Sequence, residues 1–529
     1  MQPAELEIVR HAFAFVPEEM GLALRRSAYS PNIKERMDAS CALFDADGRM
    51  VAQAEHIPVH LGSMPLAVTT LREEFEGSLH EGDQWFLNDP YRGGSHLPDI
   101  TVLKPVYRRS SLIGYAVNKA HHADVGGSAP GSMPADSRVL EDEGVVIEPQ
   151  RLLDRGAERR AAFRLIDRGM RNPIERRGDL RAQVAANELG ARRFLELAEK
   201  YGIARLLEFE SELLAYSERR VRAAIQRLPI GTWSSEDFLE DAITESDVRI
   251  SVSVTVGRGG LKVDFAGTAP QVEGNLNAPY SVTLSAVYYG IRCLTDPDVP
   301  SNAGCTAPIA VLAPRGSLLN PRSPAAVAAG NVETSQRIVD ALFLAVAPAL
   351  PDRVPAQSQG TMNNVLIGGR WREHEFAYYE TLAGGEGALP YRNGQSGIHT
   401  HMTNTRNTPV EALELAYPLR IEEYRIVPGS GGDGRFRGGD GLRRIYRLLV
   451  PATVTIVSDR RRRGPQGLAG GASGRPGRNL FRRGARVRRL SGKTTFTAKA
   501  DDVVIVETPG GGAWGGVPAA SRGNDASHP

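Results

Sequence analysis

The stretch RISVSVTVGRGGLKVDFAG, residues 249–267, decides the fold class, because polar and apolar side chains alternate on both sides of its GRGG turn. Its apolar side chains fall on one face of an extended chain: Ile250, Val252, Val254, Val256, Leu261, Val263 and Phe265. Strict alternation around a glycine turn is typical of two antiparallel strands. This stretch is therefore predicted to be a β-hairpin.

Helical patterns flank the hairpin. Residues 178–228 are rich in Ala, Leu, Glu and Arg, with apolar residues at helical spacing, and residues 333–350 repeat this signal. Residues 6–26 also carry one apolar face, although Pro17 is expected to kink or break that helix. Long helices are thus predicted between residues 178 and 228, with further helices on either side.

Short apolar runs bounded by glycine and proline, at 85–130 and beyond 410, are predicted to be strands. The resulting order of helix, strands, long helices, hairpin, helix and strands predicts a mixed α/β protein with several lobes and several β-sheets. Five regions follow: an N-terminal α/β metal-site region (1–177), a helical region (178–245), a central hairpin and helix region (246–410), a Gly-rich β region (411–515) and a disordered tail (516–529).

Composition excludes several classes of protein. The 529 residues are 41% hydrophobic and 24% charged, with a net charge of +2, which is typical of a folded chain without a strong field for nucleic acid or anionic membranes. The cysteines, Cys41, Cys293 and Cys305, are too few and too scattered for a disulfide framework. We therefore expect a cytoplasmic protein with neither a secretory signal nor a membrane span.

A basic run, Arg460 to Arg463, follows Asp459 directly. Because the total charge is nearly balanced, pairing with internal carboxylates or a solvated face explains this run better than nucleic-acid contact. The Walker-type pattern GxxxxGK followed by Ser or Thr is absent from the sequence. If ATP is used, another chain is expected to bind it.

Metal-ligand residue types concentrate between 88 and 124. His96 and Asp99 lie three apart in HLPD, and His121 and His122 open a second loop after a strand-like run. Imidazole and carboxylate groups held on loops or strand ends suit divalent metals. The same Asn, Asp, Gly and Pro residues also stabilise turns without any ligand. Spacing leaves a metal site and a set of turn residues both open.

Consecutive residues of an extended chain point to opposite sides, so His121 and His122 are not expected to face the same ion. One would be a ligand and the other a proton carrier or a group that supports a ligand. A further set of histidines is interpreted as surface or core residues: His11, His56, His60, His80 and His374.

Six motifs together resemble the hydantoinase B/oxoprolinase family from about residue 5 to about residue 515. They are NDPYRGGSHLPDI (88–100), HHADVGG (121–127), RNPIERRGDLRAQVAAN (171–187), NVETSQRIVDAL (331–342), GTMNN (360–364) and HMTNTRNTPVE (401–411). This family includes the B component of ATP-dependent N-methylhydantoinases, the C-terminal half of 5-oxoprolinase, one component of a lactamase and the alpha component of acetone carboxylase.

The resemblance implies a partner, a hydantoinase A-like subunit with an actin-like ATPase fold. That partner would use ATP and Mg²⁺ to phosphorylate the carbonyl or enol oxygen of the substrate. It also implies a divalent metal, Zn or Mn, on this chain, with ligands matching His96, Asp99 and His121 and with Asp38 as a candidate fourth.

The implied function is the metal-binding subunit of an ATP-dependent cyclic amide hydrolase, within a hetero-oligomer. A ketone carboxylase subunit of the alpha type and a non-catalytic scaffold for the ATPase are the alternatives. If His121 is a ligand, His122 faces away from the ion and is a candidate to relay a proton to the leaving nitrogen, while Asp124 fixes its tautomer. Alternatively, His122 and Asp124 only hydrogen-bond the glycine turn behind them.

Overall fold

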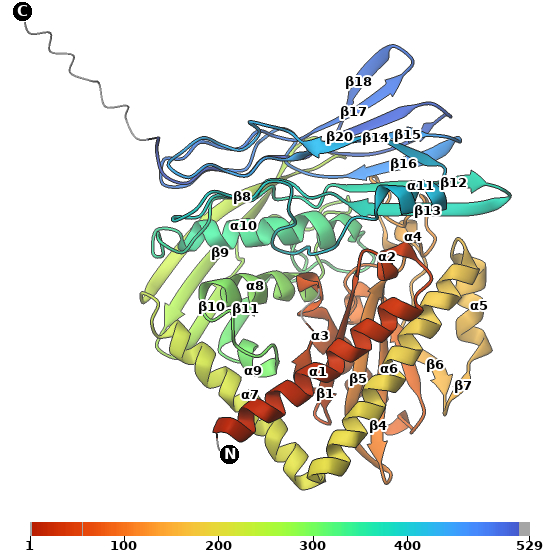
Figure 1. Cartoon of the computed structure of the whole chain (residues 1–529). Coiled ribbons are helices and arrows are strands. Elements are labelled where there is room, and N and C mark those ends of the chain that lie inside the picture. Colours follow the sequence, from red (N-terminus) through yellow and green to blue (C-terminus); the bar gives the residue numbers. More distant parts are fainter. Residues whose placement is uncertain (1–2, 55–56, 518–529) are drawn as a thin grey trace, which may run out of the picture.

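The computed structural model describes residues 3–54 and 57–517. Its strands form four sheets within these ranges, and helices lie between and beside them (Figure 1). The predicted mixed α/β architecture with several sheets is confirmed. Of the predicted tail, only residues 516 and 517 are described, and His56 also lies outside the described ranges. None of the described helices combines the length and apolar character that crossing a membrane requires.

The N-terminal region is built on a seven-stranded antiparallel sheet. Its strands in spatial order are β2 (Met50–Gln53), β1 (Ala39–Asp45), β5 (Ser111–His121), β4 (Asp99–Arg108), β3 (Gln84–Leu87), β6 (Gln150–Asp154) and β7 (Ala157–Glu158). Both faces are covered, which is why β1 is buried along its whole length. Helices α1 (Pro3–Ser27) and α6 (Pro173–Tyr201) pack on one face, and α3 (Ser63–Phe75) packs on the other (Figure 1).

Helix α1 is continuous through Pro17, so of the expected kink or break the break does not occur. Its apolar stripe, which includes Phe13 and Met20, packs against Phe194 and Ala186 of α6. Burying such a stripe stabilises the helix by more than the single backbone hydrogen bond that a proline removes. Packing against the neighbouring helix therefore outweighs the local effect of the proline.

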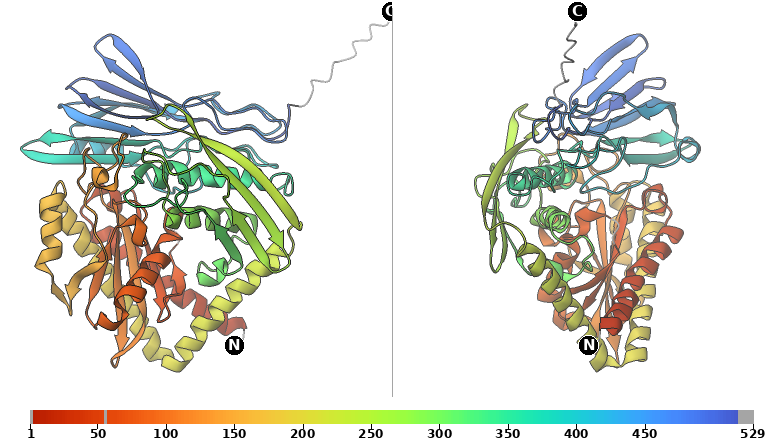
Figure 2. Two further views of the ribbon diagram at one scale, coloured as in Figure 1. Left: turned by 180° about the vertical axis from the view of Figure 1, so that it is seen from behind. Right: turned by 60° about the vertical axis from the view of Figure 1, so that its left-hand side comes forward.

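Long helices occupy residues 178–228, as predicted. Helix α6 ends at Tyr201, and the next residue, Gly202, has a φ of 79° that turns the chain into α7 (Ile203–Ile225). Shorter α5 (Arg160–Gly169) precedes them, and strand β8 (Gly231–Glu240) already begins inside the range 178–245. Figure 2 shows α7 leaving the first sheet and leading to the central lobe.

The central lobe contains the predicted hairpin. Strands β9 (Asp247–Gly257) and β10 (Gly260–Asp264) pair antiparallel, and β8 and β11 (Ile309–Leu312) complete a four-stranded sheet. The alternating apolar residues of β9 face α10 (Ser335–Val346) and α8 (Tyr280–Leu294) in one core. A π-helical turn, η4 (Gly330–Thr334), leads into α10.

The C-terminal lobe is a pair of packed sheets. One has the order β13 (His374–Thr381), β12 (Asn364–Trp371), β16 (Ala452–Val457) and β19 (Lys493–Ala498). The other has the order β14 (Leu419–Ile426), β15 (Leu442–Leu448), β20 (Val503–Glu507), β17 (Arg478–Arg483) and β18 (Arg486–Leu490). Their facing side chains form a common core. Strands β12 and β13 come from the predicted central region 246–410 but belong to this lobe.

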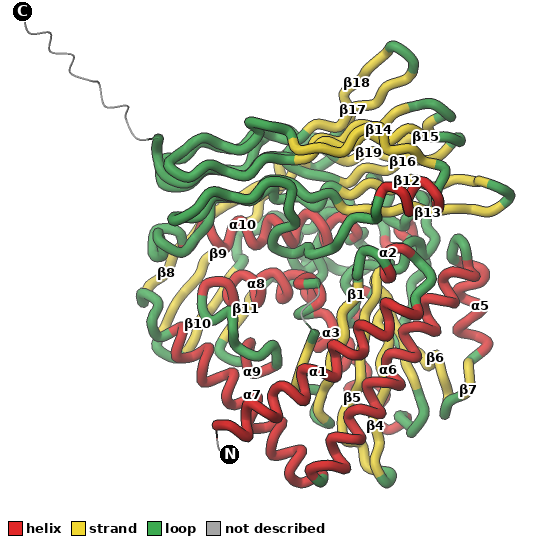
Figure 3. The backbone as a smooth tube through the Cα atoms, in the orientation of Figure 1, coloured by secondary structure: helices red, strands yellow, loops and turns green. Residues whose placement is uncertain are grey.

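Shorter elements connect these units: α2 (Pro31–Lys34), η1 (Pro58–His60), η2 (Glu76–Ser78), η3 (Pro90–Arg92), α4 (Leu140–Glu143), α9 (Ala303–Thr306) and α11 (Val410–Ala416). Glycine-rich loops extend beside the C-terminal strands (Figure 3). There, the Gly511 amide donates to Gly439 O, and a Cβ at Gly511 would lie 2.0 Å from Glu386 O. Such close backbone contact requires glycine and accounts for part of the high glycine content.

Candidate metal centre

Two neighbouring strands place side chains at one end of the seven-stranded sheet. Asp99 begins β4 and lies directly opposite His121, the last residue of β5. His96 stands on the loop just before β4, and the His96 carbonyl accepts a hydrogen bond from the Asp99 amide. Antiparallel register and this tight turn therefore bring the three predicted ligands to one place.

The three side chains form a compact buried group. Ligand atoms of His96, Asp99 and His121 lie within 4.8 Å of one another. His96 Nε2 is 3.3 Å from Asp99 Oδ1, and the ring centroids of His96 and His121 are 5.0 Å apart. All three residues are at most 3% exposed. A set of two imidazoles and one carboxylate at this spacing suits Zn²⁺ or Mn²⁺.

Hydrogen bonding supports this fit. His96 Nε2, His121 Nε2 and Asp99 Oδ1 are buried and have no hydrogen-bond partner among the described residues. Burial, with the charge of His96, holds the pKa of His121 well below its ordinary value, so this imidazole is neutral. Burial alone would raise the pKa of Asp99, but His96 and His60 hold it well below its usual range. A carboxylate and neutral imidazole are the protonation states that bind metal.

Asp38 lies beside the group and is not one of its three members. Its carbonyl accepts a hydrogen bond from the His121 amide, and its carboxylate is 3.9 Å from Arg36 Nη2. Burial raises the pKa of Asp38, while Arg36 lowers it and Asp99 raises it further. The predicted role of Asp38 as a fourth ligand stays a prediction.

His60 is a neighbour of the site that the sequence interpretation left among ordinary surface or core histidines. It is fully buried, with Nδ1 2.8 Å from Ser40 Oγ and Nε2 3.4 Å from Asp99 Oδ2. Its apolar surroundings in the sequence, PVHLGSMP, are the signal that indicates burial. Since a buried imidazole requires polar partners, that signal points to a polar cluster without saying which one.

A buried lysine balances the charge of the carboxylate. Lys119 Nζ donates to Ser95 Oγ at 3.1 Å, and Ser95 Oγ donates to Asp99 Oδ2 at 2.6 Å. Burial lowers the pKa of Lys119 to about 8. This chain of contacts ends on Oδ2 of Asp99, which leaves Oδ1 directed at the histidines.

His122 points to the opposite face of the sheet from His121, as the alternation of an extended strand predicts. Its Nε2 is 2.9 Å from Gln183 Oε1 on α6, and Gln183 also bonds Asn118. Burial lowers the pKa of His122 to about 4. The structure thus surrounds this ring with a polar network between sheet and helix.

Asp124 stabilises the loop after β5. It accepts hydrogen bonds from the Gly126 and Gly131 amides, each at 2.7 Å, and from Arg171. In the part of the chain that the structure describes, Asp124 makes no hydrogen bond to His122. The contacts of Asp124 match the alternative of a turn-stabilising residue, and the predicted proton-transfer roles of His122 and Asp124 stay predictions.

The far side of the cluster is covered by the C-terminal lobe. Tyr379 of β13 stacks on His121, with ring centroids 4.6 Å apart, and the Arg36 guanidinium lies 4.5 Å from the Tyr379 ring. Arg36 also donates to Tyr379 O. The N-terminal sheet and the C-terminal lobe therefore enclose the cluster between them.

Comparisons with known proteins agree over nearly the whole chain. The family model described as hydantoinase B/oxoprolinase matches residues 2–517. An uncharacterized protein of Methanocaldococcus jannaschii is 42% identical over 97% of this chain and 91% of its own length. The B component of a putative D-/L-hydantoinase from a Pseudomonas species is 33% identical over 90% of this chain and 83% of its own length. 5-Oxoprolinase 1 of Arabidopsis thaliana is 39% identical over 97% of this chain but 42% of its own length, so this chain spans less than half of that protein.

Two solved structures have the same fold. The ATP-dependent caprolactamase from Pseudomonas jessenii has a TM-score of 0.92 at 29% identity, over 98% of this chain and 91% of that chain. Nucleotide-free acetone carboxylase has a TM-score of 0.90 at 19% identity, over 97% of this chain and 76% of that chain, and this likeness shows the fold alone. With a family model that matches almost every residue and relatives aligned along its full length, the chain belongs to the hydantoinase B/oxoprolinase family.

Proposed function

We propose that this chain is the metal-binding subunit of an ATP-dependent cyclic amide hydrolase, which acts on a carbonyl that a partner ATPase subunit has phosphorylated. The observation that carries the proposal is the buried group of His96, Asp99 and His121 with its unpartnered ligand atoms. Relatives named as a 5-oxoprolinase, a putative hydantoinase and a caprolactamase supply the class of reaction.

The residues of this chain have separate tasks in the proposal. His96, Asp99 and His121 hold the ion, with Asp38 as the candidate fourth ligand. A bound Zn or Mn ion would supply Lewis acidity and lower the pKa of water at the site. Tyr379 and the surrounding burial exclude bulk solvent, and Lys119 balances the charge of Asp99 through Ser95. Phosphorylation turns an unreactive amide into an electrophile with a good leaving group.

ATP and Mg²⁺ belong to a hydantoinase A-like partner in this proposal, because the sequence has no Walker-type loop. We place the hetero-oligomer in the cytoplasm, in keeping with three scattered cysteines. There are two alternatives to the hydrolase. One is a ketone carboxylase subunit, since the fold of this chain is similar to that of acetone carboxylase, and the other is a scaffold that only supports the ATPase.

One reconstitution separates these functions. The purified chain alone should release neither ADP from ATP nor product from 5-oxoproline, hydantoin or caprolactam. With its partner, it should couple ADP release to ring opening of at least one of these amides. Carboxylation of acetone without amide hydrolysis would establish the carboxylase instead. ADP release with an unchanged yield when His96 is replaced by Ala would establish the scaffold.

Metal analysis tests the site independently of activity. His96→Ala, Asp99→Ala and His121→Ala should each lose nearly all bound Zn or Mn, because removing one of three ligands costs more affinity than the about 10–100-fold typical of supporting residues. Asp38→Ala should show whether a fourth ligand exists. The exposed His374 at the start of β13, changed to Ala, is the matched control. A folded His96→Ala protein with wild-type metal content would rule out this assignment.

A further inference from the structure

A cavity of about 620 Å³ lies between helix α8, turn η1 and the segment 399–404. This volume falls within the roughly 300–1,000 Å³ of small-molecule sites. One wall is apolar and includes Ile57, Leu61, Leu294 and Phe343. The other wall is polar and is built by His399, Thr400, His401 and Thr403. The lining also carries Arg292, Arg353 and Glu386, so the cavity combines apolar side chains with a smaller number of polar and charged groups, as sites for small organic ligands do.

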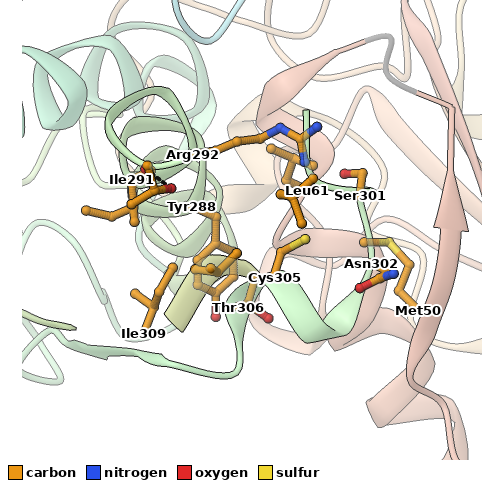
Figure 4. A pocket seen from close by; sticks show the side chains of 13 residues that line it. Met50, Leu61, Tyr288, Ile291, Arg292, Ser301, Asn302, Cys305, Thr306 and Ile309 are labelled. Atoms are coloured by element: carbon orange, nitrogen blue, oxygen red, sulfur yellow. Dashed lines mark hydrogen bonds between the residues drawn. The ribbon is translucent and has the colours of Figure 1, made fainter. Parts of the chain in front are cut away.

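A second, much smaller pocket lies beside this cavity and shares Leu61, Arg292 and Ser301 with it (Figure 4). Figure 4 shows Arg292 extending from α8 toward Leu61, with Cys305 and Thr306 below them in this view. Its volume of about 40 Å³ admits a few water molecules at most. Of the two, the larger cavity therefore has room for a ring and the smaller one does not.

The polar wall presents unused hydrogen-bonding groups. Both ring nitrogens of His399, together with Thr400 Oγ1 and Thr403 Oγ1, are buried and have no hydrogen-bond partner in the described ranges. Leaving such groups unpaired costs about 1–3 kcal/mol each, so a ligand that pairs with them gains affinity. Burial lowers the pKa of His399 to about 4, and a neutral imidazole offers one donor and one acceptor.

The polar wall is held in place by its own contacts. Gln336 Nε2 of α10 donates to Thr400 O at 3.0 Å, and Tyr289 of α8 places its hydroxyl 3.4 Å from His401 Nδ1. The neighbouring imidazole of His401 packs edge-on against Phe343. A wall fixed from two helices presents its free polar groups in a constant arrangement, which favours recognition of one ligand shape.

Both walls continue to the metal centre. On the apolar side, Ile57 leads through η1 to His60, which lies 3.4 Å from Asp99. On the polar side, the segment that begins at His399 runs on to Arg406, whose amide donates to Arg36 O. Arg36 in turn lies over Tyr379, the ring that stacks on His121. These two segments therefore connect the cavity to the candidate metal centre, directly through His60 and indirectly through Arg36 and Tyr379.

We infer that this cavity of about 620 Å³ receives the ring of a cyclic amide of about five to seven ring atoms. The apolar wall packs against the carbon skeleton, and His399 and Thr403 hydrogen-bond the amide edge. This inference rests on the proposed function, because it names the place where that substrate binds. It makes the segment 399–404 the part of the chain that determines which amide is accepted.

The three cysteines allow a binding test without turnover. Cys293 is exposed and lines the cavity, Cys305 lines the small pocket, and Cys41 is buried in the sheet. Mass spectrometry measures the rate at which each cysteine is alkylated in the complex of this chain with its partner. The chain carries the His96→Ala substitution so that the amide is not consumed. Mildly alkaline pH is needed, because the thiolate is the reactive form and the protein atoms packed around Sγ raise the pKa of the Cys293 thiol even though the residue reaches the surface.

With 5-oxoproline, hydantoin or caprolactam at about ten times its dissociation constant, Cys293 should react about tenfold more slowly, as mass action requires. Cys305 should react at its original rate. His399→Phe keeps a flat ring but removes both nitrogens, so it should raise KM and weaken this protection while metal content stays normal. Cys293→Trp, which fills the cavity, should abolish hydrolysis with metal retained, whereas Cys305→Ser should leave hydrolysis unchanged.

The results separate this inference from the proposed function. If the complex hydrolyses an amide while that amide leaves Cys293 unprotected and Cys293→Trp stays active, the cavity assignment is overturned and the function stands. If no amide is hydrolysed but an amide protects Cys293 and not Cys305, the cavity assignment stands and the proposed reaction falls.

Discussion

The two oxygens of Asp99 have different surroundings. Oδ1 faces His96 and is otherwise unpartnered among the described residues, whereas Oδ2 accepts a hydrogen bond from Ser95 and lies 3.4 Å from His60 Nε2. Ser40 Oγ, 2.8 Å from His60 Nδ1, fixes the ring from behind. His60 and Ser95 therefore position the carboxylate so that one oxygen is free for the ion.

His60→Gln and Ser95→Ala should each lower metal affinity by about 10–100-fold, less than loss of a ligand, because they act through Asp99. Competition with a chelator measures the affinity, and His374→Gln provides the control for an exposed histidine. An affinity equal to wild type in both variants would mean that Asp99 is held by the strand alone.

His122 allows a sharp distinction between a structural and a proton-transfer role. Since its Nε2 lies against Gln183 on the face away from His121, a purely structural role would mean that His122→Gln keeps its metal and its product yield but unfolds at a lower temperature. Gln183→Ala removes the same contact from the helix side and should give a similar loss of stability. Loss of product with metal, partner binding and ATP cleavage all intact would instead establish the proton relay.

Alternation along strands made part of the site predictable. It separated His121 from His122 correctly, since the two rings lie on opposite faces of β5. It gave no information on His60, which is far from β4 in the sequence and meets Asp99 only because η1 folds over the sheet end. Contacts of this kind depend on tertiary packing, which the spacing of residues does not encode.

At the scale of elements, the helix predicted at 333–350 forms as α10, but a π-helical turn precedes it. Widened turns of this type are often found at functional positions. Here the turn carries Glu333 into the interior, where it is fully buried and accepts a hydrogen bond from the Met362 amide. The apolar pattern predicts that a helix forms here. It does not predict the extra residue of the π-helical turn, because the same pattern fits a helix with or without that residue.

Glu333 should make stability depend on pH. Burial, partly opposed by Lys493, raises its pKa from 4.5 to about 7. Between these two pH values the unfolded chain is ionised and the folded chain is protonated, so the free energy of unfolding falls as pH rises and levels off above about 7. The full effect is roughly 3 kcal/mol, at about 1.4 kcal/mol per pKa unit.

Glu333→Gln should therefore be more stable than wild type at pH above about 7 and similar to it near pH 4.5. Thermal unfolding across this pH range measures the difference, with the exposed Glu375→Gln as control. A variant whose stability follows the wild-type pH profile would show that Glu333 stays ionised in the folded protein.

At the scale of the whole molecule, local patterns identified most elements but not which sheet each strand joins. The hairpin at 249–267 was predictable, because both strands and their turn are adjacent in the sequence. β12 and β13 fall in the predicted central region, yet β12 pairs with β16 in a register that spans about ninety residues, as in Asn364 with Val457, and β13 joins the same sheet through β12. Such pairings depend on the shape of the assembled sheets, so the predicted boundary near 410 did not separate the lobes.

The basic run from Arg460 to Arg463 also contributes to the arrangement of the whole molecule. Of the two alternatives for this run, a solvated face and pairing with internal carboxylates, Arg460 shows the second, since its Nη2 lies 3.0 Å from Asp237 of β8 and 2.9 Å from Asp340 of α10. Arg337 joins the same carboxylates to Asp459, which lies two residues after the end of β16. This buried network connects the central lobe to the C-terminal lobe.

Arg460→Met should destabilise the protein by about 3–5 kcal/mol, because it removes one of the two buried arginines that balance Asp237 and Asp340. Arg462, two residues on, pairs with Asp247, but its side chain is 47% exposed, so Arg462→Met should cost less than about 1 kcal/mol. The pair is matched in residue type and position, and thermal unfolding of both variants compares a buried with an exposed arginine of one run. If the network joins the lobes, Arg460→Met should also split the unfolding into separate transitions for the C-terminal sheets and the rest. Equal effects of the two substitutions, with one transition each, would mean that the lobes are held together by their apolar cores alone.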